Sequence, residues 1–174
     1  DQGSKKRYAG VVNKNNHKKI VFKGLENVRT DWTKLARDFQ YQLYKKIFNH
    51  ESYDDFIRET VQQLISGQFD NDLIYRKRLR QTLSQYHKNI PPHARAAIKA
   101  EELFAQQQVP SRYQKKCWIE YIMTLNGPET LECQTAKLDY DHYIDKQLAP
   151  IADSILFVLD DSMENILNKQ ISLF

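Results

Sequence analysis

The chain has 174 residues, 41% hydrophobic and 28% charged, which is the composition of an ordinary globular protein long enough for one sizeable domain. Its longest apolar run covers the five residues Ile155–Leu159, whereas a membrane-spanning helix needs about twenty, so we expect no membrane association. Two cysteines, Cys117 and Cys133, are too few for a disulfide framework and lack zinc-site spacing. These features predict a protein of the reducing cytoplasm. No signal peptide is visible at the front. Because the chain begins with Asp1 rather than Met, we expect an excised piece of a longer protein.

The net charge of +4 is unevenly distributed. Residues 1–48 contain twelve Lys and Arg against four Asp and Glu, residues 49–138 twelve against eleven, and residues 139–174 two against seven. A basic front end is typical of a surface that binds a polyanion. A basic face that is merely solvated is the alternative on charge alone.

Two short β-prone runs, residues 8–12 and 19–23, flank the turn-forming residues 13–17 and predict a β-hairpin. Because two strands alone are only marginally stable, we expect the hairpin to belong to a larger sheet that this chain lacks.

Two amphipathic helices are predicted next. The first has Asp31 as its N-cap, and its buried face comprises Trp32, Leu35, Ala36, Phe39, Leu43 and Ile47. The second begins at Ser52, with Asp55 three residues later in a near capping box, and ends at Gly67.

The middle of the chain predicts one helix and one strand. Pro91 and Pro92 begin an Ala-rich helix that runs from Ala94 to about Gln106. Alternating apolar residues from Cys117 to Met123 predict a strand that ends at the turn residues 126–128.

The last part of the chain is predicted to be helical. Asp139 or Asp141 caps a helix through Leu148, Pro150 opens the next helix, and Ser162 caps a short final one. The expected fold class is therefore α+β, mainly α-helical, with short β segments and an N-terminal β-hairpin.

Five segments, in the same order along the chain, resemble bacterial family B DNA polymerases. They are Lys5–Gly10, which contains the Lys-x-Tyr motif, Phe22–Trp32, Tyr75–Leu79, Pro91–Ala97 and Asp141–Pro150. The resemblance implies that residues 1–30 end the palm, residues 31–161 form the thumb, and residues 162–174 form a last helix and a tail. One departure is Thr30, which stands where many relatives carry a second Arg after Arg29.

A thumb grips duplex DNA through its backbone, which requires Lys and Arg and sets register without reading sequence. Lys6 and Tyr8 lie on one face if this segment is a strand, and the resemblance implies that they contact a phosphate or minor-groove acceptor and the primer backbone. The predicted DNA-binding residues are Lys5, Lys6, Arg7, Tyr8, Lys23, Gly24, Arg29, Arg76, Lys77 and Arg78. For Arg29 the alternative is a salt bridge to Glu26 or Asp31, and for Arg76–Arg78 it is a solvated helix or strand edge.

No catalytic residues are predicted within the chain. The resemblance implies that the carboxylates for polymerisation, which bind Mg²⁺ in the full-length polymerase, lie upstream, so this piece alone is expected to be inactive and to hold no metal or other cofactor. The pair Asp139 and Asp141 has spacing that superficially suits a metal, but its place before an amphipathic helix favours helix capping.

The C-terminal tail resembles the peptide by which bacterial polymerases dock on the ring-shaped sliding clamp. Its candidate contact residues are Gln170, Ile171, Leu173 and Phe174. Folding of Leu173 and Phe174 back onto the core is the alternative. The acidic balance of residues 139–174 indicates that the tail faces away from DNA.

The predicted function is a duplex-binding thumb region of a DNA-directed DNA polymerase, a nucleotidyltransferase of DNA replication and repair. Its expected partners are primer–template DNA, the sliding clamp and the palm, in a monomeric, nucleoid-associated enzyme. A stand-alone nucleic-acid-binding or helical interaction module, without catalytic activity, is the alternative.

Overall fold

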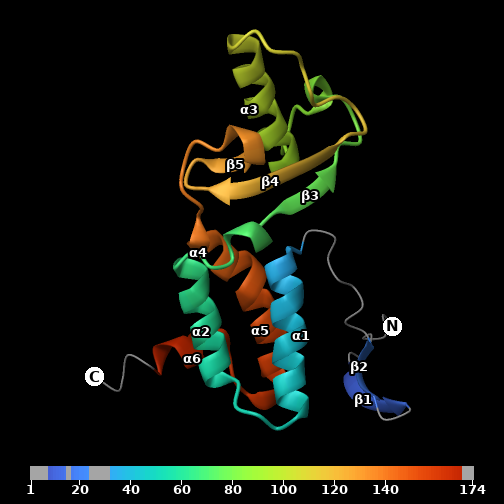
Figure 1. The fold of residues 1–174 in the computed structure, drawn as a ribbon, viewed down its shortest axis with the longest axis vertical. Helices are drawn as coiled ribbons and strands as arrows, with labels where there is room; N and C mark the ends of the chain where they lie inside the picture. The colour runs from blue at the N-terminus through green and yellow to red at the C-terminus, as the bar shows by residue number, and fades with distance from the viewer. Residues whose placement is uncertain (1–7, 15–16, 24–31, 170–174) are drawn as a thin grey trace. The chain divides into compact units, whose positions relative to one another are not determined.

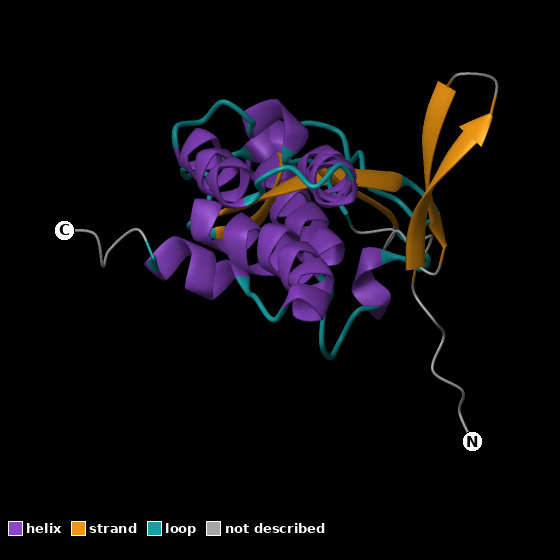
Figure 2. Ribbon diagram, turned by 90° about the horizontal axis from the view of Figure 1, so that it is seen from below, coloured by secondary structure: helices purple, strands orange, loops and turns teal. Residues whose placement is uncertain are grey.

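The computed structural model describes residues 8–14, 17–23 and 32–169, with side chains described for 32–169. The chain divides into two compact units: residues 1–68 with 145–174, and Phe69–Ile144. Helices predominate, and two separate antiparallel sheets accompany them (Figure 2). The prediction of a mainly α-helical α+β fold is confirmed.

The N-terminal hairpin is confirmed, with longer strands than predicted. Strand β1 (Tyr8–Lys14) pairs antiparallel with β2 (His17–Lys23), from Tyr8 opposite Lys23 to Lys14 opposite His17. Residues that were predicted to lie in the turn therefore pair across the two strands.

Helix α1 (Lys34–Phe48) begins at a different cap from the predicted Asp31. The cap is Thr33, whose hydroxyl accepts a hydrogen bond from the Ala36 N–H at 3.3 Å. Both the backbone N–H and the hydroxyl of Thr33 donate to the Gln147 side-chain oxygen, each at 3.0 Å, and both residues are buried. The start of the helix is therefore held by a local cap and by a contact with a distant part of the chain.

Helix α2 (Asp54–Ile65) also starts later than predicted, and the capping box at Ser52 is wrong. Tyr53 is the cap and makes no capping side-chain hydrogen bond; its hydroxyl instead donates to the Asp161 carboxylate at 3.3 Å. The end of the helix is as predicted: Gly67 has φ +87°, and its N–H donates to the Leu64 carbonyl at 3.1 Å.

The first unit is a helical assembly of α1, α2, α5 (Ala149–Leu156) and α6 (Met163–Asn168) (Figure 1). Its buried side chains include Leu35, Phe39, Leu43, Ile57, Leu64, Leu148, Ile151, Leu156, Met163 and Ile166. Ser162 caps α6 as predicted, accepting from the Asn165 N–H at 3.1 Å. Phe39 and Phe56 stack at 5.6 Å between ring centroids, which joins α1 to α2.

The helical run after residue 139 confirms two sequence predictions. Asp139 caps α4 (Tyr140–Tyr143), accepting from the His142 N–H at 3.2 Å. A π-helical turn follows at Ile144–Leu148, and α5 then begins with Pro150 in its first turn. Proline is tolerated there because the first N–H groups of a helix have no intrahelical acceptor.

The second unit packs α3 (Pro92–Gln106) against a three-stranded antiparallel sheet (Figure 1). The strand order is β3 (Tyr75–Arg78), β4 (Trp118–Thr124) and β5 (Gly127–Thr130). The sequence predicted β4 but missed β3 and β5. Pro128 suits an edge strand, where its missing N–H breaks no ladder bond. Leu125 and Asn126 form the turn of a β4–β5 hairpin, so the predicted end of the sheet at residues 126–128 is instead the start of β5.

A stack of tyrosines forms the centre of the second unit. Tyr75 stacks on Tyr121 at 5.1 Å and on Tyr143 at 5.6 Å between ring centroids. The Tyr143 hydroxyl donates to the Leu73 carbonyl at 2.8 Å and accepts from the Met123 N–H at 2.9 Å. Burial raises the pKa of Tyr143 well above its usual range. Three segments distant in sequence are thus joined at one buried ring.

Among the described residues, none of the helices combines the length and apolar content needed to cross a membrane.

Candidate nucleic-acid interface

The basic run Arg76–Arg78 forms the edge strand β3, and the pleat of the strand divides its side chains. Arg76 lies opposite Glu120, Lys77 opposite Ile119, and Arg78 opposite Trp118. Because neighbouring side chains of a strand alternate and opposite pairs share a face, Arg76 and Arg78 share a face with Trp118 and Glu120. The structure therefore brings together two of the three predicted residues.

Lys77 lies on the other face of β3, with the buried Tyr75 and Ile119. Burial lowers the pKa of His93 on α3, and the positive charge of Lys77 lowers it further. Lys77 therefore lies on the opposite face of β3 from Arg76 and Arg78, and a contact of these three residues with DNA stays a prediction.

Trp118 is the residue of this face that the sequence analysis missed. It is 49% exposed, and the Arg76 guanidinium lies over its ring at 4.1 Å from the centroid. The Arg76 Nε is also 3.7 Å from a Glu120 carboxylate oxygen. The exposed positions of β4 alternate with buried Ile119 and Tyr121, and that alternation was the available signal.

The Arg78 guanidinium is held by a hydrogen bond to the segment that precedes β4. Its Nε donates to the Lys116 carbonyl at 2.9 Å, and the Leu79 N–H donates to the Cys117 carbonyl at 2.8 Å. Arg80 follows on the exposed side. The open face of β3 and β4 thus combines cations with an aromatic ring, as nucleic-acid-binding surfaces do.

The other predicted DNA-binding residues are at the front of the chain. Tyr8 and Lys23 are paired at the open end of the β1–β2 hairpin, and their side chains are outside the described part. Lys5, Lys6, Arg7, Gly24 and Arg29 lie outside the described residues, as do Gln170, Ile171, Leu173 and Phe174 of the tail.

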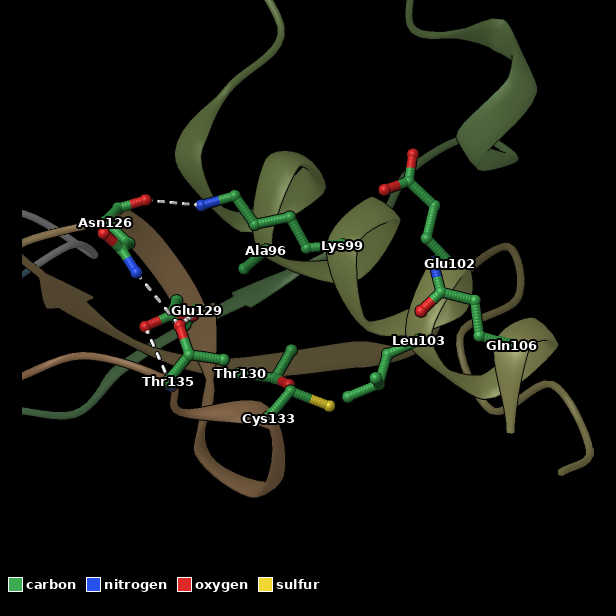
Figure 3. A pocket seen from close by; sticks show the side chains of 10 residues that line it. All are labelled: Ala96, Lys99, Glu102, Leu103, Gln106, Asn126, Glu129, Thr130, Cys133 and Thr135. Carbon is green, nitrogen blue, oxygen red and sulfur yellow. Dashed lines mark hydrogen bonds between the residues drawn. The ribbon is translucent and has the colours of Figure 1, made fainter. Parts of the chain in front are cut away.

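A separate pocket of about 510 Å³ lies between α3 and the β4–β5 hairpin (Figure 3). The Lys99 ammonium donates to the carbonyls of Asn126 at 2.7 Å and Pro128 at 3.1 Å. Glu129 accepts from the hydroxyls of Thr124 and Thr135, both at 2.6 Å, and from two backbone N–H groups. These charged groups bind the protein itself, so the pocket is better explained as structural than as a ligand site.

The residues present do not fit a two-metal polymerase centre. Asp139 is engaged as the cap of α4, and Asp161 accepts from the Ser162 N–H at 2.8 Å and from Tyr53. Within residues 8–14, 17–23 and 32–169, no group of three or more His, Cys, Asp or Glu side chains could hold a metal ion. Cys117 and Cys133 are free thiols.

Comparison with known proteins gives consistent matches. The sequence model of DNA polymerase family B matches residues 3–168. The chain is 48% identical, over all its residues, to DNA polymerase II of Escherichia coli, and 29% identical over 88% of its length to DNA polymerase 2 of Aeropyrum pernix. It spans only 22% and 19% of those two proteins.

A solved structure matches as well. The family B DNA polymerase of Pyrobaculum calidifontis superposes with a TM-score of 0.65 and 27% identity, covering 86% of this chain and 20% of the archaeal one. Sequence and structure agree over nearly the whole length, and the chain belongs to DNA polymerase family B.

Proposed function

We propose that this chain is the thumb, with the last strands of the palm, of a DNA-directed DNA polymerase of the DNA polymerase II kind, and that it grips the primer–template duplex. The observation that carries the proposal is the 48% identity to Escherichia coli DNA polymerase II, which extends over every residue of the chain. The open face of β3 and β4 supports it, because Arg and Lys contacts to phosphates hold DNA without reading its sequence.

The chemistry of nucleotidyl transfer belongs, in this proposal, to the remainder of the polymerase. The chain spans 22% of Escherichia coli DNA polymerase II, and in the part that the structure describes no group of three or more His, Cys, Asp or Glu side chains could hold a metal ion. The isolated chain should not extend a primer in the presence of Mg²⁺ and dNTPs. Robust incorporation by the pure chain would contradict the proposal.

The tail is proposed to dock on a bacterial sliding clamp. Gln170 offers a hydrogen-bonding amide, and Ile171, Leu173 and Phe174 offer apolar side chains that a pocket on the clamp would bury. The polymerase would then act as a monomer held at the DNA during replication or repair.

Binding of the chain to a bacterial sliding clamp, measured by surface plasmon resonance, tests the tail. We expect micromolar affinity that is lost when residues 170–174 are removed. The double variant Leu173→Ala and Phe174→Ala should lose binding equally, whereas Ser172→Ala should retain it. If the intact chain does not bind, or if truncation leaves the affinity unchanged, the docking proposal is wrong while the family assignment stands.

A further inference from the structure

A hollow of about 550 Å³ lies where β3 ends and β4 begins, within the unit Phe69–Ile144. It is lined by Arg78, Leu79, Arg80, Lys116 and Trp118. Three of these five side chains are cations, and none is acidic. Leu79 is fully buried, whereas Trp118 is half-exposed, so the Trp118 ring supplies the apolar wall beside the charged rim.

The backbone holds the two sides of the hollow together. The bond from the Leu79 N–H to the Cys117 carbonyl (2.8 Å) and the bond from the Arg78 Nε to the Lys116 carbonyl (2.9 Å) join the end of β3 to the turn before β4. This contact uses one of the five N–H donors of the Arg78 guanidinium. Its two terminal nitrogens remain available, on a guanidinium whose orientation is already set.

The nearby carboxylate is already paired. Glu120 lies 3.7 Å from Arg76, whose guanidinium covers the Trp118 ring at 4.1 Å from the centroid. In the part of the chain that the structure describes, no ion pair involves Arg78, Arg80 or Lys116. Arg76 therefore braces the indole, while the three cations of the hollow lack an anionic partner within the described residues.

We propose that this hollow binds a phosphate group of a nucleic-acid backbone, with Arg78, Arg80 and Lys116 as its ligands and Trp118 packed against the adjoining sugar. An Arg fork matches two phosphate oxygens, and Lys adds a point charge. The inference rests on the proposed function and deepens it, because it adds Arg80, Lys116 and Trp118 to the DNA contacts and removes Lys77 from them.

Lys77 provides a matched control, since Lys77→Ala removes the same charge one residue from Arg78 but on the other face of β3. Binding of the 174-residue chain to a fluorescent mixed-sequence DNA duplex is measured by anisotropy across a salt series. Arg78→Ala, Arg80→Ala and Lys116→Ala should each weaken binding severalfold and reduce the slope of log K against log salt by about one. Lys77→Ala should change neither, and Arg78→Lys should keep the slope but lose affinity.

Tryptophan fluorescence distinguishes the DNA backbone from free phosphate. The chain has two tryptophans, so quenching of Trp118 by acrylamide is followed in a Trp32→Phe background. Duplex DNA should protect Trp118 from the quencher, and inorganic phosphate at equal phosphate concentration should not. If inorganic phosphate protects Trp118 from acrylamide as well as duplex DNA does, the ligand is free phosphate rather than a nucleic-acid backbone, and the proposal is wrong.

The remaining outcomes separate this site from the function on which it rests. If Arg78→Ala, Arg80→Ala and Lys116→Ala all leave duplex binding unchanged, the proposal that the hollow binds a phosphate is wrong, while the proposal of a DNA-binding thumb stands. An equal loss in Lys77→Ala also overturns it, because general charge would then explain the effect. Failure of the intact chain to bind any duplex overturns both.

Discussion

Glu129 is a buried carboxylate whose hydrogen bonds tie the β4–β5 hairpin to the loop that follows it. Burial alone would raise its pKa, but donation from the hydroxyls of Thr124 and Thr135 and from two backbone N–H groups outweighs burial and lowers the pKa below the ordinary 4.5. A lowered pKa in the folded state means that the ionised group stabilises the fold. At the residue scale, this network supports the sheet that presents the candidate interface.

The contribution of Glu129 should depend on pH in a defined direction. Because its folded pKa is depressed, the contribution is present above the unfolded pKa and is lost as the pH falls through the folded pKa. Glu129→Ala should lower the free energy of unfolding near neutral pH by about 3 kcal/mol, since buried donors lose their acceptor. It should also flatten the decline in stability below pH 4.5.

Urea unfolding at a series of pH values provides the measurement. Glu102→Gln, which removes a charge from an exposed position of α3, is the control and should have little effect. Equal stability of Glu129→Ala and the unmodified chain at neutral pH would show that the network contributes nothing.

At the scale of elements, strand pairing decides what the basic run presents. Tyr75 and Lys77 share one face of β3, and Arg76 and Arg78 the other, because side chains alternate along a strand. The pairing of Tyr75 with Tyr121 fixes which residues of β4 lie beside them. The same pairing places Trp118 beside Arg78. The sequence grouped these three cations together, whereas in the structure the two arginines lie on one face of β3 and the lysine lies on the other.

The end of α2 depends on one glycine. Gly67 has φ +87°, a conformation that side-chain-bearing residues adopt at a cost of about 1–2 kcal/mol. Gly67→Ala should lower the midpoint and the free energy of unfolding by about that amount, measured by circular dichroism during thermal and urea unfolding. Gln68→Ala, at an exposed neighbouring position, is the matched control. Equal free energies of unfolding for the two variants would mean that the left-handed conformation of Gly67 does not require glycine.

At the scale of the whole molecule, the chain forms two units with different connectivity. Phe69–Ile144 is continuous, whereas the other unit combines residues 1–68 with 145–174. The continuous unit has its own core, which includes Leu73, Leu79, Ile119, Phe104 and Tyr143. Its hydrophobic burial therefore does not require the segments on either side.

We expect residues 69–144 to fold when produced alone. The excised segment should unfold cooperatively and show a near-ultraviolet circular dichroism signal from the stacked Tyr75, Tyr121 and Tyr143. A shorter segment that ends at Leu138 lacks Tyr143 and its bonds to Leu73 and Met123, and it should lose cooperativity. A featureless melt of the longer segment would contradict the assignment of an independent core.

Local signals predicted much of this fold because they act within a few residues. The hairpin, the Pro-started helix α3, the Gly67 end of α2, and the caps at Asp139 and Ser162 follow from turn, capping and periodicity chemistry. The ordered motifs also predicted the family, which the comparisons confirm.

What only the tertiary structure decided depends on partners far along the chain. The cap residue Thr33 is hydrogen-bonded to Gln147. β5 is a strand because β4 pairs with it despite Pro128. The neighbours of Arg76, Lys77 and Arg78 on β4, and the hollow between Arg78 and Lys116, follow from the pairing of β3 with β4. By itself the sequence determined which helices form and to which family the chain belongs. Long-range pairing and burial decided which side chains meet, because a pattern within a few residues does not identify the distant segment that packs against it.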